Sequence, residues 1–196
     1  MMDDDGAVAG EVLDMLRESG ALREGHFELS SGRHSNGYVQ CALLLEDPVR
    51  ARRLGNWLAD RLRPYKPESI LSPALGGVVI GHEVAAALGV PFRFTERKDG
   101  RMQLRRGFAL RQGERIAVVE DVVTTGGSTR EAAAVAVGLG AAWVCSGAIV
   151  DRSSGTTRFA APFQTLLKLD LPTWPAATCP LCADGTPPEK PGSRPS

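Results

Sequence analysis

Two strand–helix–strand units in tandem constrain the fold of this chain more than any other feature of its sequence. Each unit consists of a short apolar segment, a glycine-containing loop, an apolar-periodic helix and a second apolar segment. The predicted elements are 69–72, 78–88 and 91–95 in the first unit and 116–120, 128–139 and 142–150 in the second. Such units form parallel strands whose crossover helices pack on the sheet. The sequence therefore predicts an α/β fold with a parallel sheet flanked by helices.

Weaker signals place further elements around these units. Asp47-Pro48 combines a capping carboxylate with proline at the first helical position, and it predicts a helix that ends by Pro64. The buried side of this helix is expected to carry Val49, Leu54, Trp57, Leu58 and Leu62. The other predicted elements are a helix at 7–18 capped by Asp4 or Asp5, a hairpin within 26–45 with a turn at 30–37, a long polar hairpin or mobile loop at 97–115, and a strand at 165–171.

Length and composition favour one domain. The chain has 196 residues, of which 43% are hydrophobic, and a formal net charge of zero. We expect one domain over 1–172 and a tail over 173–196, because seven of the 13 prolines lie in 172–196. The end of the tail is expected to be disordered.

The same composition excludes several classes of partner. The balanced charge gives no sign of nucleic-acid binding, and no apolar run approaches the roughly 20 residues that cross a bilayer. The acidic opening Met-Met-Asp-Asp-Asp is followed by no apolar run, and four cysteines are too few for a disulfide framework. We therefore expect a cytoplasmic protein without membrane or nucleic-acid partners.

Residues 118–129 carry the strongest chemical signal. Glu120 and Asp121 follow a buried strand, at the sheet edge where ligands bind in open parallel sheets. The loop Thr124–Ser128 supplies glycines, hydroxyls and backbone N–H groups at a helix N-terminus, which suits a phosphate. Adjacent carboxylates can accept hydrogen bonds from the two hydroxyls of a ribose. The combination predicts a ribose 5-phosphate site; the alternative is a solvated strand end followed by an ordinary turn.

This stretch resembles the phosphoribosyl pyrophosphate (PRPP) motif of type I phosphoribosyltransferases, in the form Glu-Asp-Val-Val-Thr-Thr-Gly-Gly-Ser seen in orotate phosphoribosyltransferases. Three other segments resemble the orotate family in the same order along the chain. They are Phe27-Glu28-Leu29-Ser30-Ser31-Gly32-Arg33-His34-Ser35 followed by Tyr38, Ser72-Pro73-Ala74-Leu75-Gly76-Gly77, and Asp151-Arg152. The likeness extends over about residues 8–172.

The resemblance implies transfer of ribose 5-phosphate from PRPP to orotate, with Mg²⁺ bound mainly through PRPP and no metal site made by the protein. It also implies a homodimer in which a basic loop is shared between subunits, and a small hood built from segment 20–45 and the C-terminal segment. The implied PRPP-binding residues are Glu120, Asp121, Val122, Val123, Thr124, Thr125, Gly126, Gly127 and Ser128, with Ala74, Leu75 and Gly76 in a second loop. The implied orotate-binding residues are Ser30, Thr124 and Arg152, and the implied catalytic residues are Arg97, Lys98, Arg101 and Asp121.

Residues 93–115 form a basic segment that the neutral total conceals. It holds eight basic and three acidic side chains, a local charge of +5. Arg97 and Lys98 match the start of the family's mobile catalytic loop, which is expected to stabilise pyrophosphate and exclude water. The alternative is a solvated hairpin.

The chain departs from the family pattern at three places. Ser30 and Gly76 stand where the better-known pattern has lysine, and the basic segment lacks a histidine. Arg101, Arg105 or Arg106 are candidates to compensate. Arg152 has an alternative as the partner of Asp151 in a surface ion pair. Two other functions stay open: a phosphoribosyltransferase for a purine or another base, and a PRPP-sensing regulator without catalysis.

Cys179 and Cys182 have the spacing of half a zinc site, but the sequence contains no second Cys-x-x-Cys. Free thiols are therefore expected, with a zinc shared across a dimer or a local disulfide as alternatives. His34 and His82 are expected to be structural rather than catalytic.

Overall fold

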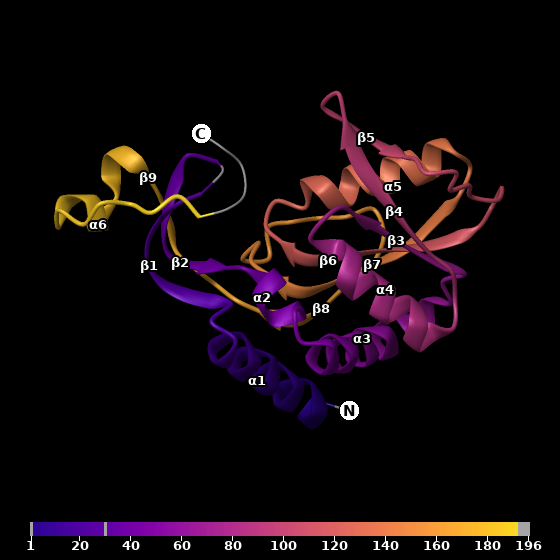
Figure 1. Ribbon diagram of the computed structural model, residues 1–196, viewed down its shortest axis with the longest axis horizontal. Helices are drawn as coiled ribbons and strands as arrows, with labels where there is room; N and C mark the ends of the chain where they lie inside the picture. Colours follow the sequence, from indigo (N-terminus) through magenta and orange to yellow (C-terminus); the bar gives the residue numbers. More distant parts are fainter. Residues whose placement is uncertain (1, 30, 192–196) are drawn as a thin grey trace.

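The computed structural model describes residues 2–29 and 31–191 and contains a six-stranded sheet in the order β5-β4-β3-β6-β7-β8 (Figure 1). The strands are β3 (Ser69–Pro73), β4 (Phe92–Lys98), β5 (Arg101–Leu104), β6 (Arg115–Val123), β7 (Ala142–Asp151) and β8 (Phe163–Lys168). All neighbouring pairs are parallel except β4 and β5, which form an antiparallel hairpin at the edge. The predicted α/β class and both predicted strand–helix–strand units are confirmed.

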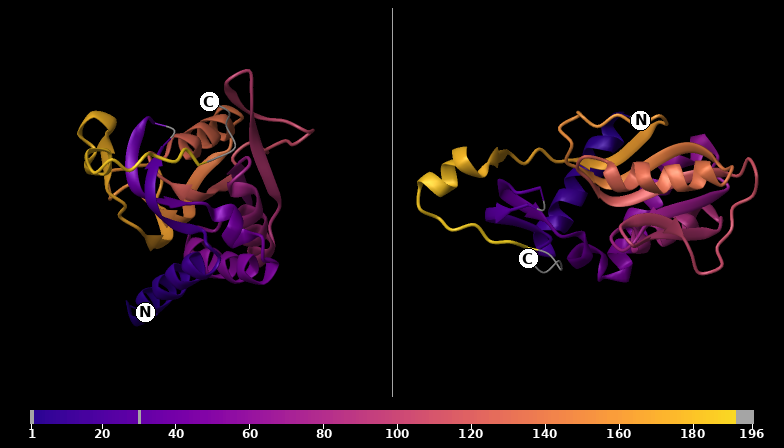
Figure 2. Two further views of the ribbon diagram at one scale, coloured as in Figure 1. Left: turned by 60° about the vertical axis from the view of Figure 1, so that its left-hand side comes forward. Right: turned by 90° about the horizontal axis from the view of Figure 1, so that it is seen from above.

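Helices cover both faces of this sheet (Figure 2). The helices are α1 (Met2–Glu18), α2 (Cys41–Leu45), α3 (Pro48–Leu62), α4 (Gly77–Leu88) and α5 (Gly127–Gly138). Alternate residues of β6 face opposite sides of the sheet. Ala117 and Val119 belong to the hydrophobic cluster that contains residues of α1, α3 and α4, and Ile116 and Val118 belong to the cluster that contains residues of α5. A strand buried on both faces needs an uninterrupted apolar run, which explains the sequence that precedes Glu120.

The helix predicted from Asp47-Pro48 is confirmed as α3. The Asp47 carboxylate accepts a hydrogen bond from the Val49 N–H at 2.8 Å, and Pro48 occupies the first helical position. Val49 itself is 75% exposed, so its predicted place on the buried side is wrong. It lies in the first turn, where the helix has not yet reached the core.

Two predictions near the N-terminus need correction. Helix α1 begins at Met2 rather than at residue 7, so Asp4 and Asp5 lie inside it rather than at its cap, and Asp5 pairs with Arg61. The predicted turn at 30–37 is too long, because strand β2 (Arg33–Val39) already begins at Arg33. The polar residues of β2 resemble a turn in the sequence, but they pair with chain from the far C-terminal region.

That pairing builds a small hood at the left of Figure 1. Strands β1 (Leu22–Glu28), β2 and β9 (Thr173–Pro175) form an antiparallel sheet in that order. After β9 come the 3₁₀ turn η2 (Ala176–Thr178) and the short helix α6 (Pro180–Ala183). The predicted boundary between 172 and 173 thus falls directly before a hood strand. The end of the tail, 192–196, lies outside the described residues. None of the helices in the described residues is long and apolar enough to cross a membrane.

Candidate active site

The predicted acid pair lies at the carboxyl end of β6. Glu120 Oε2 is buried, and no atom of the described residues forms a hydrogen bond with it. Asp121 Oδ1 accepts a hydrogen bond from the Val122 N–H at 2.8 Å. Burial raises the pKa of both carboxyl groups, and that of Glu120 is raised well above its ordinary value, with the charge of Asp121 adding to the effect. An unpartnered buried carboxylate oxygen is costly in a folded chain, so its presence at this edge indicates a place for a ligand's donors.

The loop after the acids has the geometry of an anion cradle. Gly126 has φ +73° and precedes the first turn of α5, whose N-terminus has no side-chain cap. A Cβ at Gly126 would lie 2.8 Å from atoms of Phe159 and Thr157, so this left-handed position admits only glycine. The backbone N–H groups at the start of α5 are therefore available to a phosphate. Arg130 lies one turn into the helix and donates to the Thr125 carbonyl at 2.6 Å.

The second predicted loop, Ala74–Gly76, lies against the acid pair. A Cβ at Gly76 would stand 2.6 Å from Asp121 Oδ1 and 2.8 Å from Oδ2. Any side chain there would have to displace the carboxylate. This close approach gives a physical reason for glycine at a position where the family resemblance predicts lysine.

Arg152 directly follows β7, the strand next to β6, and therefore lies at the same edge of the sheet as the acid pair. Its Nε is buried and has no hydrogen-bond partner among the described residues. Burial lowers the pKa of its guanidinium. Asp151 accepts a hydrogen bond from the Ser153 N–H at 2.9 Å and forms no ion pair with Arg152. The alternative of a surface ion pair between these two residues is therefore wrong.

Two adjoining cavities connect these groups. The larger, about 1030 Å³, lies between the hood and the core sheet; its lining includes Tyr38, Thr124, Thr125, Arg130, Arg152, Thr173 and Lys190. The smaller, about 250 Å³, is lined by Arg97, Glu120 and the cradle residues Val122–Thr129, with Glu131. Val122, Thr124 and Thr125 line both cavities. A two-part ligand can therefore place a phosphate in the small cavity and a planar ring in the large one.

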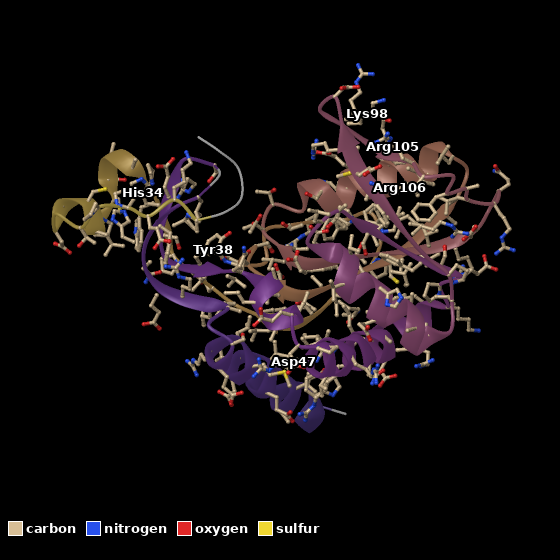
Figure 3. All side chains as sticks on the ribbon, viewed as in Figure 1. His34, Tyr38, Asp47, Lys98, Arg105 and Arg106 are labelled. Carbon is tan, nitrogen blue, oxygen red and sulfur yellow. The ribbon has the colours of Figure 1, made fainter. Side chains whose placement is uncertain are left out.

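The first part of the basic segment, 93–104, is an antiparallel hairpin of β4 and β5, which is one of the two predicted forms, and residues 105–114 follow it without regular secondary structure. Arg97 lies beside the cradle, where it pairs with Glu131 at 2.6 Å. Figure 3 shows Lys98 at the tip of the hairpin, away from the cradle, with Arg105 and Arg106 lower on the same hairpin. Both arginines pair with Glu96, at 3.0 Å each. Arg101 is exposed on β5. Of the predicted catalytic cations, only Arg97 lies at the site of its own chain.

Some site residues were not assigned a role from the sequence, and one assignment lies outside the described part. Tyr38 approaches the large cavity from the hood, and Arg130 from α5. The sequence signal that could have identified Arg130 is its position in the first turn of the motif helix, near the N-terminus where a phosphate is expected to bind. Ser30, predicted to bind orotate, lies outside the described residues, although Leu29 and Ser31 line the large cavity.

Comparison with known proteins identifies the arrangement. The family model described as phosphoribosyl transferase domain matches residues 44–184. Orotate phosphoribosyltransferase from Thermotoga petrophila is 52% identical over 183 residues, which are 93% of this chain and 98% of that protein. The same enzyme from Heliobacterium modesticaldum is 50% identical over 186 residues, 94% of this chain and 97% of that protein. The crystal structure of orotate phosphoribosyltransferase from Aeropyrum pernix is 26% identical, with a TM-score of 0.64 over 80% of this chain and 92% of that one.

Proposed function

The chain belongs to the orotate phosphoribosyltransferase family, and we propose that it transfers the ribose 5-phosphate group of PRPP to orotate. The products are orotidine 5′-monophosphate and pyrophosphate, and the reaction serves pyrimidine nucleotide synthesis. The observation that carries the proposal is a pair of unsatisfied buried groups of opposite charge, Glu120 Oε2 in the carboxyl-terminal half of β6 and Arg152 Nε directly after β7. An acceptor beside the cradle suits ribose hydroxyls, and a guanidinium in the adjoining cavity suits a planar acid.

We assign the remaining roles from position. Glu120 and Asp121 accept hydrogen bonds from the two ribose hydroxyls, and residues Thr124–Ser128 bind the 5-phosphate through backbone N–H groups and hydroxyls. Thr124 lines both cavities and therefore also contacts the base. Arg152 binds the carboxylate or a carbonyl edge of orotate through its planar fork of donors. The loop Ala74–Gly76, in which Gly76 lies against Asp121, binds the pyrophosphate.

The reaction needs no protein nucleophile. As pyrophosphate leaves, positive charge grows on the sugar ring and negative charge grows on the leaving group. As the proposed acceptor for a ribose hydroxyl, Asp121 would stabilise the ring through its negative charge. Arg97, beside the small cavity, is placed to stabilise the pyrophosphate. Glu120 Oε2 has no partner among the described residues, so a ribose donor would satisfy a buried oxygen that is costly to leave unpaired.

The site fits a Mg²⁺ ion that arrives with PRPP. Mg²⁺ prefers phosphate oxygens and water, with one or two carboxylates at most. Glu120 and Asp121 supply those carboxylates, and within residues 2–29 and 31–191 the one cluster of three or more potential metal ligands lies in the hood, not here. When bound, the ion neutralises charge on the pyrophosphate.

Lys98 and Arg101 are proposed to act in the partner subunit of a homodimer. Both are exposed on the β4–β5 hairpin, and Lys98 points away from the cradle of its own chain (Figure 3). A closing hairpin from a second subunit would bring their charge to the pyrophosphate and exclude water. We expect this dimer to act in the cytoplasm.

The decisive experiment offers one base at a time. The purified chain is incubated with PRPP, Mg²⁺ and either orotate, adenine, guanine or hypoxanthine, and pyrophosphate release is followed. We expect turnover with orotate alone. Turnover with a purine but not orotate would assign the chain to another base, and PRPP binding without turnover on any base would identify a regulator.

A further inference from the structure

Four potential metal ligands converge in the hood, far from the acid pair along both the sequence and the fold. They are His26 on β1, His34 on β2, and Cys179 and Cys182 around α6. One ligand atom from each residue lies within 4.8 Å of the others. Figure 3 shows His34 directed toward the yellow C-terminal segment rather than toward the core sheet. We propose that these four side chains bind one Zn²⁺ ion, which holds the C-terminal segment on the hood.

The distances are close to those of a tetrahedral site. Zn–N bonds of about 2.0–2.1 Å and Zn–S bonds of about 2.3 Å place neighbouring ligand atoms about 3.3–3.8 Å apart. His26 Nε2 lies 3.5 Å from Cys179 Sγ and 3.8 Å from Cys182 Sγ. His34 Nδ1 lies 3.3 Å from Cys182 Sγ and 2.8 Å from His26 Nε2. To bind zinc, the two ring nitrogens would need to move apart by about half an ångström.

The hydrogen bond at Nδ1 of His26 favours metal binding through its other ring nitrogen, Nε2. Its Nδ1 lies 2.7 Å from the Thr186 carbonyl oxygen. Since a carbonyl only accepts, Nδ1 carries the proton and donates, so the lone pair of Nε2 points into the cluster. Metal-binding histidines usually donate their second ring nitrogen in this way. Thr186 belongs to the same segment as the two cysteines, so the segment supplies both ligands and the group that orients a third.

Burial distinguishes this cluster from a chance surface grouping. His26, His34 and Cys179 are 5%, 6% and 3% exposed, and Cys182 is exposed. Four protein ligands fill a tetrahedral zinc and leave no position for water, which is the pattern of a structural site. Two thiolates and two imidazoles favour zinc over the harder Mg²⁺ or Ca²⁺. The exposed Cys182 gives the ion a path from solvent.

The C-terminal segment has little else to hold it. Among the described residues from 172 to 191, Cys179 is the only buried one. The other attachments include β9, the backbone hydrogen bonds of Glu189 with His26 and Glu28, a few side-chain hydrogen bonds to the segment's backbone, and exposed ion pairs such as Arg23 with Glu189. Exposed ion pairs contribute about 0–1 kcal/mol each. A segment this short without a core is of the kind that a structural metal commonly stabilises.

The ion would also support the proposed substrate cavity. Thr173 and Lys190, from the two ends of the segment, line the large cavity. Thr173 accepts from Arg33, and Lys190 pairs with Glu28 across the hood. Loss of the ion is expected to loosen one wall of this cavity and leave the cradle on the core sheet unchanged.

The first test is the metal content of the full-length chain, expressed without a histidine tag and purified in reducing buffer without chelator. We expect about one zinc per chain, and less than about a tenth of that in the Cys179→Ser/Cys182→Ser and His26→Gln/His34→Gln variants. His82→Gln is the matched control, because His82 is exposed on α4 and outside the cluster; it should keep its zinc. A wild-type chain that holds no zinc after incubation with an equimolar zinc salt and gel filtration would overturn the proposal, as would zinc retained by both double variants.

A second test needs no variant and therefore does not depend on mutant folding. The wild-type chain is stripped with a chelator, and hydrogen exchange of residues 176–189 is compared before and after zinc is restored. We expect exchange at least about 10-fold faster without the ion and slow again with zinc but not with Mg²⁺. Cobalt in place of zinc should give the visible absorption of four-coordinate thiolate sites. Equal exchange in the stripped and zinc-loaded chains would refute the role of the ion in holding the segment.

Discussion

Strand β6 is preceded by one buried carboxylate, that of Glu114, and contains another, that of Glu120, and the two differ in their hydrogen bonding. At the amino end, Glu114 is 2% exposed and its oxygens accept hydrogen bonds from Ser69 Oγ at 2.6 Å, Arg93 Nη1 at 2.7 Å and the Arg111 N–H at 2.9 Å. At the carboxyl end, Glu120 keeps a buried oxygen with no partner among the described residues. A fully satisfied carboxylate therefore lies directly before β6, and an unsatisfied one lies in its carboxyl-terminal half.

The pKa values of the two groups follow from this difference. Burial alone would raise the pKa of Glu114, but its three donors and the charge of Arg93 outweigh burial and lower the pKa from 4.5 to about 2. At Glu120 burial is unopposed, and the pKa rises. The carboxylate at the amino end thus stabilises the fold, whereas the one at the carboxyl end keeps an unsatisfied oxygen that a bound ligand can satisfy.

Removing the charge of Glu114 should have the largest effect. Glu114→Gln leaves Arg93 without its buried partner and weakens two further hydrogen bonds. A lowering of the pKa by 2.5 units corresponds to about 3 kcal/mol, so we expect the free energy of unfolding at pH 7 to fall by about 3 kcal/mol. Urea denaturation measures this. The rate of pyrophosphate release per folded molecule should stay within about twofold of wild type. A large loss of activity in the folded variant would show that the two ends are not separate.

Glu120→Gln is the counterpart of that variant and should reverse the pattern. Its charge supports a ligand rather than the fold, so we expect kcat/KM for PRPP to fall by about 30- to 100-fold, as for loss of hydrogen bonds to a charged group. The free energy of unfolding should be unchanged or should rise by about 1 kcal/mol, because an unpartnered buried charge is gone. Steady-state kinetics and urea denaturation on the same preparation test both parts. A destabilised variant with full activity would assign Glu120 to the fold.

The pH dependence of stability sharpens the comparison. Because the folded pKa of Glu114 lies below its unfolded value, its contribution is complete above about pH 4.5 and disappears as the pH falls toward 2. The difference in unfolding free energy between wild type and Glu114→Gln should therefore shrink by about 2 kcal/mol between pH 7 and pH 3. For Glu120 the sign is opposite: its folded pKa is raised, so protonation as the pH falls should stabilise the free protein, and Glu120→Gln should remove that gain. Parallel slopes for all three proteins would contradict both assignments.

The same contrast explains how much the sequence could predict. The start of α3, the body of β6 and the cradle depend on residues close together in the chain, and their local patterns were sufficient. Glu114 was visible only as one acid in a basic segment, because two of its donors come from β3 and β4. The start of β2 was mistaken for a turn because its partner β9 lies about 140 residues further along.

The hood cluster shows the same limit most clearly. Cys-x-x-Cys was recognised as half of a metal site, but nothing in the spacing of His26 and His34 connects them with it. Only the antiparallel hairpin, with its irregular register between Glu24 and Phe27, and the return of the chain through β9 bring the four side chains together. Sites made within one loop can be read from sequence, whereas sites made by sheet pairing need the fold.

The smallest expected effect comes from a single hydroxyl at the satisfied end. Ser69→Ala removes one donor from Glu114 and leaves Arg93 and the Arg111 N–H in place, so the free energy of unfolding should fall by about 1.5 kcal/mol, and the pKa of Glu114 should rise by about one unit. Ser72→Ala is the matched control on the same strand, because Ser72 Oγ is also buried but has no hydrogen-bond partner among the described residues. Losing that hydroxyl should be neutral or slightly stabilising. Carboxyl titration by NMR and urea denaturation of the two variants measure the difference. If both serines cost the same, the low pKa of Glu114 does not come from Ser69, and the contrast between the two ends of β6 depends on Arg93 and the Arg111 N–H alone.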